Sequence, residues 1–226
     1  LGLIGGYPMG AITCAEAYSQ KLCTKEDAER ALAFCNNCGP AFILGAIGSG
    51  VFSSGKAGAA LLIIHISAAL TTGILFHVFR PPQKSGAAIA QGSKCNTPGF
   101  AKAFTSSVAK ALSSSLSISA YVVLFSALVK MMTILGIFPF IGSLTEKLLG
   151  CRQETATAFV SGVFEMTLGA FSLARCISAS KAFVLISFLL GWGGLSVHAQ
   201  ALSFISDTDL SVKNYFCGKI MHGALS

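Results

Sequence analysis

The stretch Asn36-Asn37-Cys38-Gly39-Pro40 interrupts a run of apolar sequence that extends from residue 31 to residue 47. A second interruption, Gly191-Trp192-Gly193-Gly194, follows the apolar residues 182–190. Proline removes a backbone donor and glycine weakens a helix, so both stretches are typical of broken helices. In a bilayer, such backbone must be buried in protein or line a watery cavity, because lipid provides no hydrogen-bond partners. In a membrane protein, the pair would therefore indicate a transport site.

Composition places the chain in a membrane. Hydrophobic residues make up 53% of the sequence and charged residues only 11%, and the mean hydropathy is +0.70. A soluble domain carries about 25% charged residues. Residues 57–79, 121–140 and 182–204 each approach or exceed the ~20 mainly apolar residues that cross the hydrocarbon core. We therefore predict an all-α, polytopic integral membrane protein rather than a soluble protein with a large apolar core.

The charge distribution predicts an orientation. The chain has 16 basic and 9 acidic residues, but it has no dense basic run that would suit a nucleic acid. Residues 80–110 contain no acidic residue and hold five basic ones, which are Arg80, Lys84, Lys94, Lys102 and Lys110. Positively charged loops stay in the cytoplasm, so we expect the loop 80–110 to be cytoplasmic.

The apolar segments repeat in outline. Residues 1–79 contain a Gly/Pro break near residue 8, the interruption near residue 38 and an unbroken span. Residues 154–226 show a similar order, with the interruption near residue 193 in second place. We therefore predict two repeats containing broken or re-entrant helices, 1–79 and 154–226. Residues 80–153 would form a cytoplasmic linker plus a connecting transmembrane helix.

Several finer features are predicted from composition. Residues 45–58 are rich in glycine and serine and are expected to form a turn, and residues 142–153 a short charged connection. Residues 102–116 are expected to form an interfacial helix that leads into a span at 117–136. The sequence lacks an initial methionine and a signal-peptide pattern, and it stops inside an apolar run. We expect it to be the middle of a longer protein, with the second repeat truncated at its C-terminal end.

The two interruptions supply the candidate substrate-binding residues. Asn36 and Asn37 provide amide donors and acceptors where the helical hydrogen-bond ladder is already broken. Ser196, His198 and Gln200 provide a similar set just after the second interruption. These side chains suit a polar neutral solute, or a cation held by oxygen atoms, better than covalent catalysis. The alternative is that they are buried helix contacts that only stabilise the fold.

Ionisable residues in apolar segments are costly and mark functional sites. Glu165 lies between Phe164 and Met166 and is the candidate for coupling a proton or cation. The favoured interpretation of His65 is that it packs against neighbouring helices, and the alternative is that it relays protons. Glu16 and Lys130 are weaker candidates, because each could lie near a membrane surface.

Neither an enzyme nor a metal site is predicted. Cys35 and Cys38 form the only CxxC among eight cysteines, and neither a second CxxC nor a histidine cluster completes a metal site. Small apolar packing is the favoured role of these thiols, and a redox pair is the alternative. The sequence contains no GxSxG, HExxH or Walker motif. We expect no cofactor.

Two segments resemble a known family. Gly6-Tyr7-Pro8-Met9-Gly10-Ala11 and the residues 29–43, which include Asn36-Asn37-Cys38-Gly39-Pro40, are similar to the sporulation integral membrane protein YlbJ family. Residues 193–200 resemble its downstream segment. That family falls in a wider group with a nucleoside recognition, or Gate, domain, which includes ferrous iron transporters and, more distantly, nucleoside transporters. The resemblance implies a protein of the cytoplasmic membrane that helps to build the spore envelope, without naming a substrate.

The leading hypothesis is a transporter or permease for a small polar solute or an ion, built from two Gate-like repeats in the cell membrane. The alternative is a non-transporting scaffold or assembly protein of the spore envelope. The expected partners are the lipid bilayer and the solute, with a homo-oligomer or other envelope proteins left open.

Overall fold

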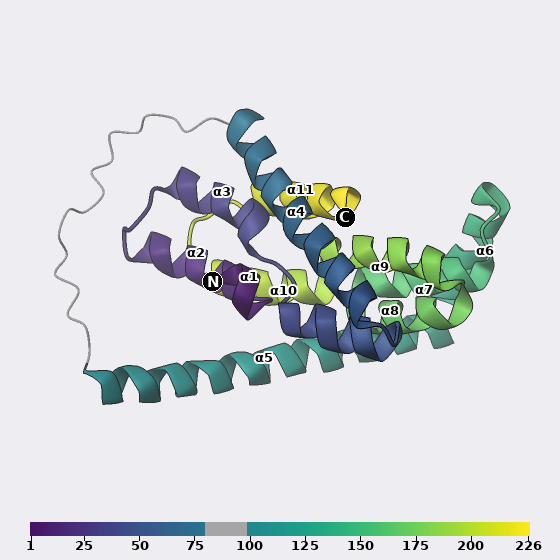
Figure 1. The fold of residues 1–226 in the computed structure, drawn as a ribbon, viewed down its shortest axis with the longest axis horizontal. Helices are drawn as coiled ribbons and strands as arrows, with labels where there is room; N and C mark the ends of the chain where they lie inside the picture. Colours follow the sequence, from purple (N-terminus) through teal and green to yellow (C-terminus); the bar gives the residue numbers. More distant parts are fainter. Residues whose placement is uncertain (80–98) are drawn as a thin grey trace.

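The computed structural model describes residues 1–79 and 99–226, and it is helical throughout these ranges with no strand (Figure 1). Five helices come before the undescribed residues: α1 (Gly2–Gly5), α2 (Met9–Ser19), α3 (Lys25–Cys35), the π-helix η1 (Phe42–Val51) and α4 (Gly55–Phe79). Seven follow: α5 (Phe100–Ile134), α6 (Ile137–Leu149), α7 (Gln153–Phe164), α8 (Met166–Cys176), α9 (Ala179–Trp192), α10 (Gly194–Ile205) and α11 (Lys213–Leu225). The prediction of an all-α fold is confirmed.

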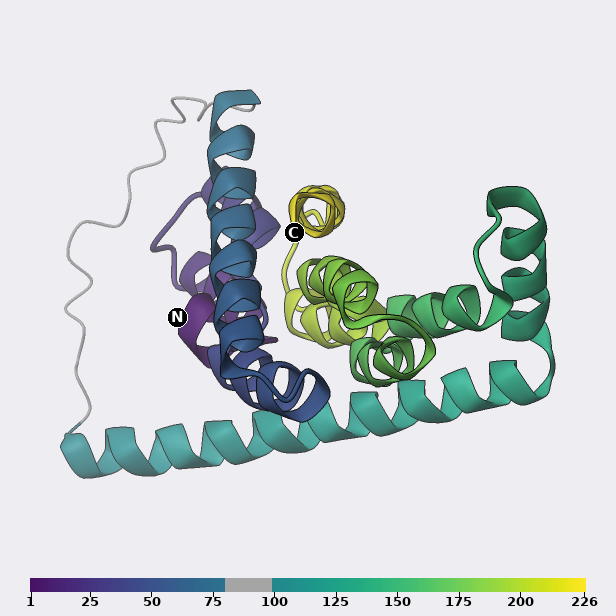
Figure 2. The same cartoon turned by 45° about the vertical axis from the view of Figure 1, so that its right-hand side comes forward.

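Among the described residues, three helical segments are long and apolar enough to cross a membrane. They are α4 with 25 residues, α5 with 35 residues, and the 27-residue segment Ala179–Ile205, which combines α9 and α10. The long helix α5 runs along one side of the bundle in both views, crosswise to α4, and α6 stands beyond its C-terminal end (Figures 1 and 2). The three spans agree with the apolar runs in the sequence.

Four breaks interrupt the helices, and each has a local cause. Gly6, with φ of 75°, precedes Pro8 at the break between α1 and α2. The residues from Asn36 to Pro40 separate α3 from η1, as predicted. Glu165 is in an extended conformation between α7 and α8, and Gly193, with φ of 93°, lies between α9 and α10. Only glycine adopts these positive φ angles readily, so the two glycine breaks follow directly from the sequence.

Two apolar clusters hold the broken helices together. One lies between η1, α4, α8 and α9 and includes Ile47, Leu61 and Ile186, all fully buried. The other joins α2 and α3 to α10 and α11 through residues such as Leu32 and Tyr215. Each cluster contains residues from both ends of the chain, so the bundle cannot be divided into two independently packed units.

The contacts between the two ends of the chain come in matched pairs. In residues 1–79 the last helix is α4 and the second broken helix is α3 with η1; in residues 154–226 they are α11 and α9 with α10. Helix α11 packs against α3, and α4 packs against α9, so each last helix contacts the second broken helix of the other predicted repeat. Helix α10 packs against α2, η1 packs against α8, and α4 contacts α11. Such reciprocity is expected of two repeats related by a two-fold axis. The contact pattern agrees with two repeats, and the repeats and their boundaries remain predictions.

Three finer predictions are wrong. Most of residues 45–58 are helical, in η1 and the start of α4, because Gly48 and Gly58 let these helices approach closely. A Cβ on Gly48 would lie 2.6 Å from the Cα of Gly58. Residues 142–149 continue α6 instead of forming a loop. The expected interfacial helix and the span after it are one continuous helix, α5. The predicted cytoplasmic loop lies largely outside the described residues.

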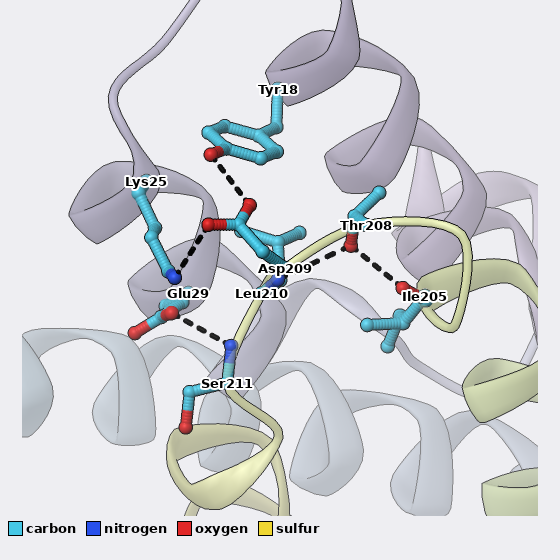
Figure 3. Close-up of polar contacts among 8 residues, drawn as sticks. All are labelled: Tyr18, Lys25, Glu29, Ile205, Thr208, Asp209, Leu210 and Ser211. Carbon is cyan, nitrogen blue, oxygen red and sulfur yellow. Dashed lines mark hydrogen bonds and ion pairs between the residues drawn. The ribbon is translucent and has the colours of Figure 1, made fainter.

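Polar contacts fasten the loop between α10 and α11 to the start of α3 (Figure 3). Lys25 Nζ and the hydroxyl of Tyr18 donate to Asp209 at 2.8 and 2.7 Å. The carboxylate of Glu29 accepts from the backbone N–H of Ser211 at 2.7 Å. Thr24 caps α3 by accepting from the N–H of Asp27. These contacts hold the two ends of the chain together outside the apolar clusters.

This loop should make stability depend on pH at the acid end. Hydrogen bonds from Lys25 and Tyr18 hold the pKa of Asp209 below its ordinary value. A lowered pKa in the folded state stabilises the protein above the unfolded pKa, and this contribution disappears as the pH falls through the folded value. Between about pH 5 and about pH 3, the melting temperature of the wild type should therefore fall slightly more than that of Asp209→Asn.

Asp207→Asn is the matched control, because Asp207 lies on the same loop and forms no ion pair with the described residues. Its melting temperature should follow the wild type across this range. Equal acid sensitivity of Asp209→Asn and the wild type would show that the loop contacts do not contribute.

Candidate functional site

The four breaks meet at one cavity of about 290 Å³. Three breaks contribute residues to its lining: Gly6 and Tyr7, Cys38 and Gly39, and Glu165. Helix α10, which begins directly after the fourth break, contributes Ser196 and Gln200. Apolar side chains, including Phe42 and Val122, complete the wall. Helix ends are thus gathered at one place, as expected where irregular backbone lines a cavity in a membrane protein.

Glycines allow the breaks to touch. A Cβ on Gly6 would lie 3.0 Å from the backbone of Gly39, so the first two breaks are in direct contact. A Cβ on Gly194 would lie 3.1 Å from the backbone nitrogen of Met166, so the other two breaks also meet. The hydroxyl of Tyr7 then donates to the carbonyl of Leu190 at 2.9 Å and links the two pairs. The walls of the cavity therefore come from both ends of the chain.

Glu165 lies at this cavity and caps α8. Its carboxylate accepts hydrogen bonds from the backbone N–H groups of Thr167 and Leu168 at 3.2 and 2.7 Å. The residue is 2% exposed, so the positive end of the α8 dipole and these two donors compensate a buried carboxylate. Glu165 therefore has a clear structural role, and its predicted part in ion coupling stays a prediction.

Ser196 and Gln200, two of the candidate substrate-binding residues, also line the cavity. They are four residues apart on α10 and so lie on one face of that helix. The side-chain oxygen Oε1 of Gln200 is buried and has no hydrogen-bond partner among the described residues. An unsatisfied buried acceptor costs free energy, so it marks a position where a bound donor would be favourable.

The other three predicted ligands lie behind the cavity, in a buried polar cluster. Asn36 accepts from the backbone N–H of Ala11 and donates to the hydroxyl of Tyr215, both at 3.4 Å. The same hydroxyl lies 2.9 Å from Nδ1 of His198. Asn37 donates to the carbonyl of Phe34 at 2.8 Å, and its Oδ1 has no partner among the described atoms. These residues hold the break between α3 and η1 in place, and contact with a solute remains a prediction for them.

Two histidines bridge α4 and α11 beside this cluster. Nε2 of His65 accepts from the backbone N–H of Cys38 at 3.1 Å, so His65 satisfies a donor left free by the first interruption. Nε2 of His222 lies 3.0 Å from the carbonyl oxygen of His65, and the two ring centroids are 4.4 Å apart. His65 therefore stabilises irregular backbone, which is close to the packing role favoured from the sequence.

Lys219, which is 1% exposed at the centre of the bundle, was not among the residues predicted from the sequence. Its Nζ donates to the hydroxyl of Tyr7 at 2.9 Å and to the backbone carbonyl of Asn36 at 3.1 Å. It also lies 4.8 Å from the centre of the Tyr7 ring. The signal was a lysine directly after Gly218 and before Ile220 in an apolar stretch, a position where a charge is costly.

The described residues contain no group of three or more His, Cys, Asp or Glu side chains that could hold a metal ion. The seven described cysteines are free thiols, and Cys38 is buried at the cavity while Cys35 is half-buried. The polar groups at the cavity are thus backbone, amide, hydroxyl and carboxylate groups. Such groups suit reversible binding of a polar molecule.

No family model matches the chain, and no solved structure matches it. It is similar to the sporulation integral membrane protein YlbJ of Bacillus subtilis, with 25% identity over an alignment of 243 positions. The alignment covers 99% of this chain and 60% of the relative. The match supports the YlbJ family assignment made from the motifs at the breaks. Together with the three spans, it confirms the prediction of an all-α integral membrane protein.

Proposed function

We propose that this chain forms the binding core of a membrane permease for a small polar solute. The observation that carries the proposal is the meeting of four helix breaks, from both ends of the chain, at one partly polar cavity. Transporters of several folds bind their substrates where discontinuous helices meet. A protein that served only as a scaffold would have no need for four costly breaks at one point.

The cavity favours an uncharged solute. The N-terminal end of α8, where an anionic group would bind, is already occupied by the carboxylate of Glu165. The groups left for a ligand are Oε1 of Gln200, the hydroxyl of Ser196 and the backbone at the breaks, beside apolar walls. A volume of about 290 Å³ is at the lower end of small-molecule sites. We therefore infer a solute with a few donors and one apolar face.

The name of the Bacillus subtilis relative places that protein in sporulation. We propose the same setting for this chain, in the cell membrane during formation of the spore envelope. The chain spans 60% of that relative, so the proposal concerns the full-length protein to which this core belongs.

The test is a binding screen on the full-length protein in lipid nanodiscs, with nucleosides, amino acids and simple metal salts. A solute that raises the melting temperature by about 2 °C or more would identify the class. If no compound in the panel shifts the melting temperature, the permease proposal is contradicted and the scaffold alternative gains.

For a solute found in this way, Gln200→Leu should weaken binding about tenfold or more, because a buried acceptor for the solute is lost. The melting temperature without solute should stay close to that of the wild type, since the acceptor has no partner among the described residues. Isothermal titration calorimetry measures the affinity. Gln20→Leu, on the exposed end of α2, is the control and should bind normally. Unchanged affinity in Gln200→Leu would remove this residue from the site.

A further inference from the structure

Lys219 is a buried cation with neutral partners. The described ion pairs of the protein do not involve it, and its Nζ donates to a hydroxyl and a backbone carbonyl. The titratable groups around it come from several elements: Tyr7 at the first break, Cys38 after α3, His65 on α4, His198 on α10, and Tyr215 and His222 on α11 itself. In α3, the titratable Cys35 is half-buried at the C-terminal end. In α9, which also packs against α11, the titratable residue Lys181 is exposed at the far end. A charge in such surroundings is expensive, so it calls for a function.

The ammonium group occupies a position suited to a bound cation. Asn36, whose carbonyl it contacts, is the residue at which α3 ends. The C-terminal end of a helix carries partial negative charge, and its last carbonyls lack partners within the helix. In transporters built on broken helices, the coupling Na⁺ or H⁺ is held at half-helix C-terminal ends and by unwound carbonyls. Here the ammonium group of Lys219, which is part of the protein itself, occupies the corresponding position at the C-terminal end of α3.

We propose that Lys219 is the coupling residue of the transport site and that a proton it carries takes the place of a metal cation. The proposal rests on the permease function proposed above and names its coupling ion. It also shifts this role from Glu165, whose carboxylate is already engaged by two backbone donors of α8. Lys219 can lose or gain a proton while its Nζ stays beside the hydroxyl of Tyr7 and the carbonyl of Asn36.

Tyr7 connects Lys219 with the cavity. Its hydroxyl accepts from Lys219 Nζ and its side chain lines the cavity wall. To release a proton, the hydroxyl rotates away from the carbonyl of Leu190, accepts a proton from the ammonium and gives its own proton to water in the cavity. An N–H bond and an O–H bond break and two O–H bonds form. The net change is one proton moved from Nζ to water, which leaves a neutral amine beside Asn36.

The first test asks which cation the site uses, and it needs no solute. The melting temperature of the full-length protein in nanodiscs is measured in sodium chloride and in N-methyl-D-glucamine chloride at equal ionic strength. The wild type should melt within about 1 °C in the two salts, because its cation position is filled. Lys219→Ala should melt about 5 °C lower or more, and sodium should restore part of this loss by binding the two freed oxygen atoms.

Lys213→Ala is the matched control, since Lys213 is exposed on the same helix, and it should behave as the wild type in both salts. A wild-type melting temperature that rises by about 2 °C or more in sodium would overturn the proposal, whether or not Lys219→Ala folds. So would a folded Lys219→Ala with no response to sodium.

The second test uses Lys219→Arg, because arginine keeps its proton throughout the range from about pH 6 to about pH 9. The difference in melting temperature between the wild type and Lys219→Arg should change by about 2 °C or more across this range. Lys219→Arg keeps every histidine of the wild type, so contributions that the two proteins share cancel in the difference. A constant difference would show that Lys219 does not exchange its proton, and the proposal would fail. Solute binding in the screen described above does not depend on this result. Failure of the Lys219 proposal can therefore be distinguished from failure of the permease proposal.

Discussion

Gly218→Ala should lower the melting temperature of the full-length protein in nanodiscs by about 5–10 °C, equivalent to roughly 2–3 kcal/mol. Helix α11 crosses α3 at this glycine, and an added Cβ would lie 2.2 Å from the carbonyl oxygen of Ala33 and 2.7 Å from its Cα. Both neighbours are backbone atoms of a fully buried residue, so no side chain can move aside. The two helices would have to separate. Differential scanning fluorimetry measures the change.

The separation should also disturb the polar cluster. Tyr215 and Lys219 lie on either side of Gly218 on α11, and both contact Asn36 at the end of α3. We therefore expect Gly218→Ala to weaken solute binding even where the protein still folds. Gly45→Ala is the matched control, because no atom of the described residues lies within 4 Å of the Cβ it would add. Alanine favours helix over glycine, so this variant should melt at or slightly above the wild-type temperature. Equal stability of Gly218→Ala and Gly45→Ala would show that α3 and α11 are not in close contact.

The breaks show what could be predicted from the sequence. Proline and glycine act locally, so the interruptions near Asn36 and Gly193 were visible in the order of residues alone. The break at Glu165 has neither residue directly at the extended position, and only the charge indicated something unusual there. Gly48 shows the limit of the same signal. Glycine permits a turn, but in a membrane it also permits close helix packing, and here it does the second.

The meeting of the breaks could not be predicted, because it depends on contacts between residues far apart in the chain. Tyr7 and Leu190 are separated by 183 positions, yet their hydrogen bond links the two pairs of breaks. Lys219 was missed for the same reason. In the sequence it shares a short segment with the exposed Lys213, and only the packing of α11 against α3 and α4 buries one lysine and leaves the other at the surface.

Glu165→Ala should lower the stability of the protein by about 2 kcal/mol, because it leaves the backbone N–H groups of Thr167 and Leu168 without an acceptor in a buried site. Glu165→Gln should lose less, since the amide oxygen can still accept one of these hydrogen bonds. Its remaining loss reflects the weaker interaction of a neutral group with the α8 dipole. Thermal unfolding of both variants in nanodiscs measures the two effects. Glu154→Ala is the control and should cost little, because this exposed residue in the first turn of α7 forms a surface ion pair with the exposed Arg152.

The comparison of these variants separates two roles that the sequence assigned to one residue. If Glu165 only caps α8, Glu165→Gln should keep both the fold and proton-coupled uptake of the solute in proteoliposomes, and Lys219 would be the coupling group. If the carboxylate carries the coupling ion, Glu165→Gln should fold and bind solute but lose uptake driven by the ion gradient. We expect the first result, because both hydrogen bonds described for the carboxylate go to its own helix and none reaches Lys219. A stable Glu165→Gln without coupled uptake would return the coupling role to Glu165, and a Glu165→Ala protein as stable as the wild type would contradict the cap.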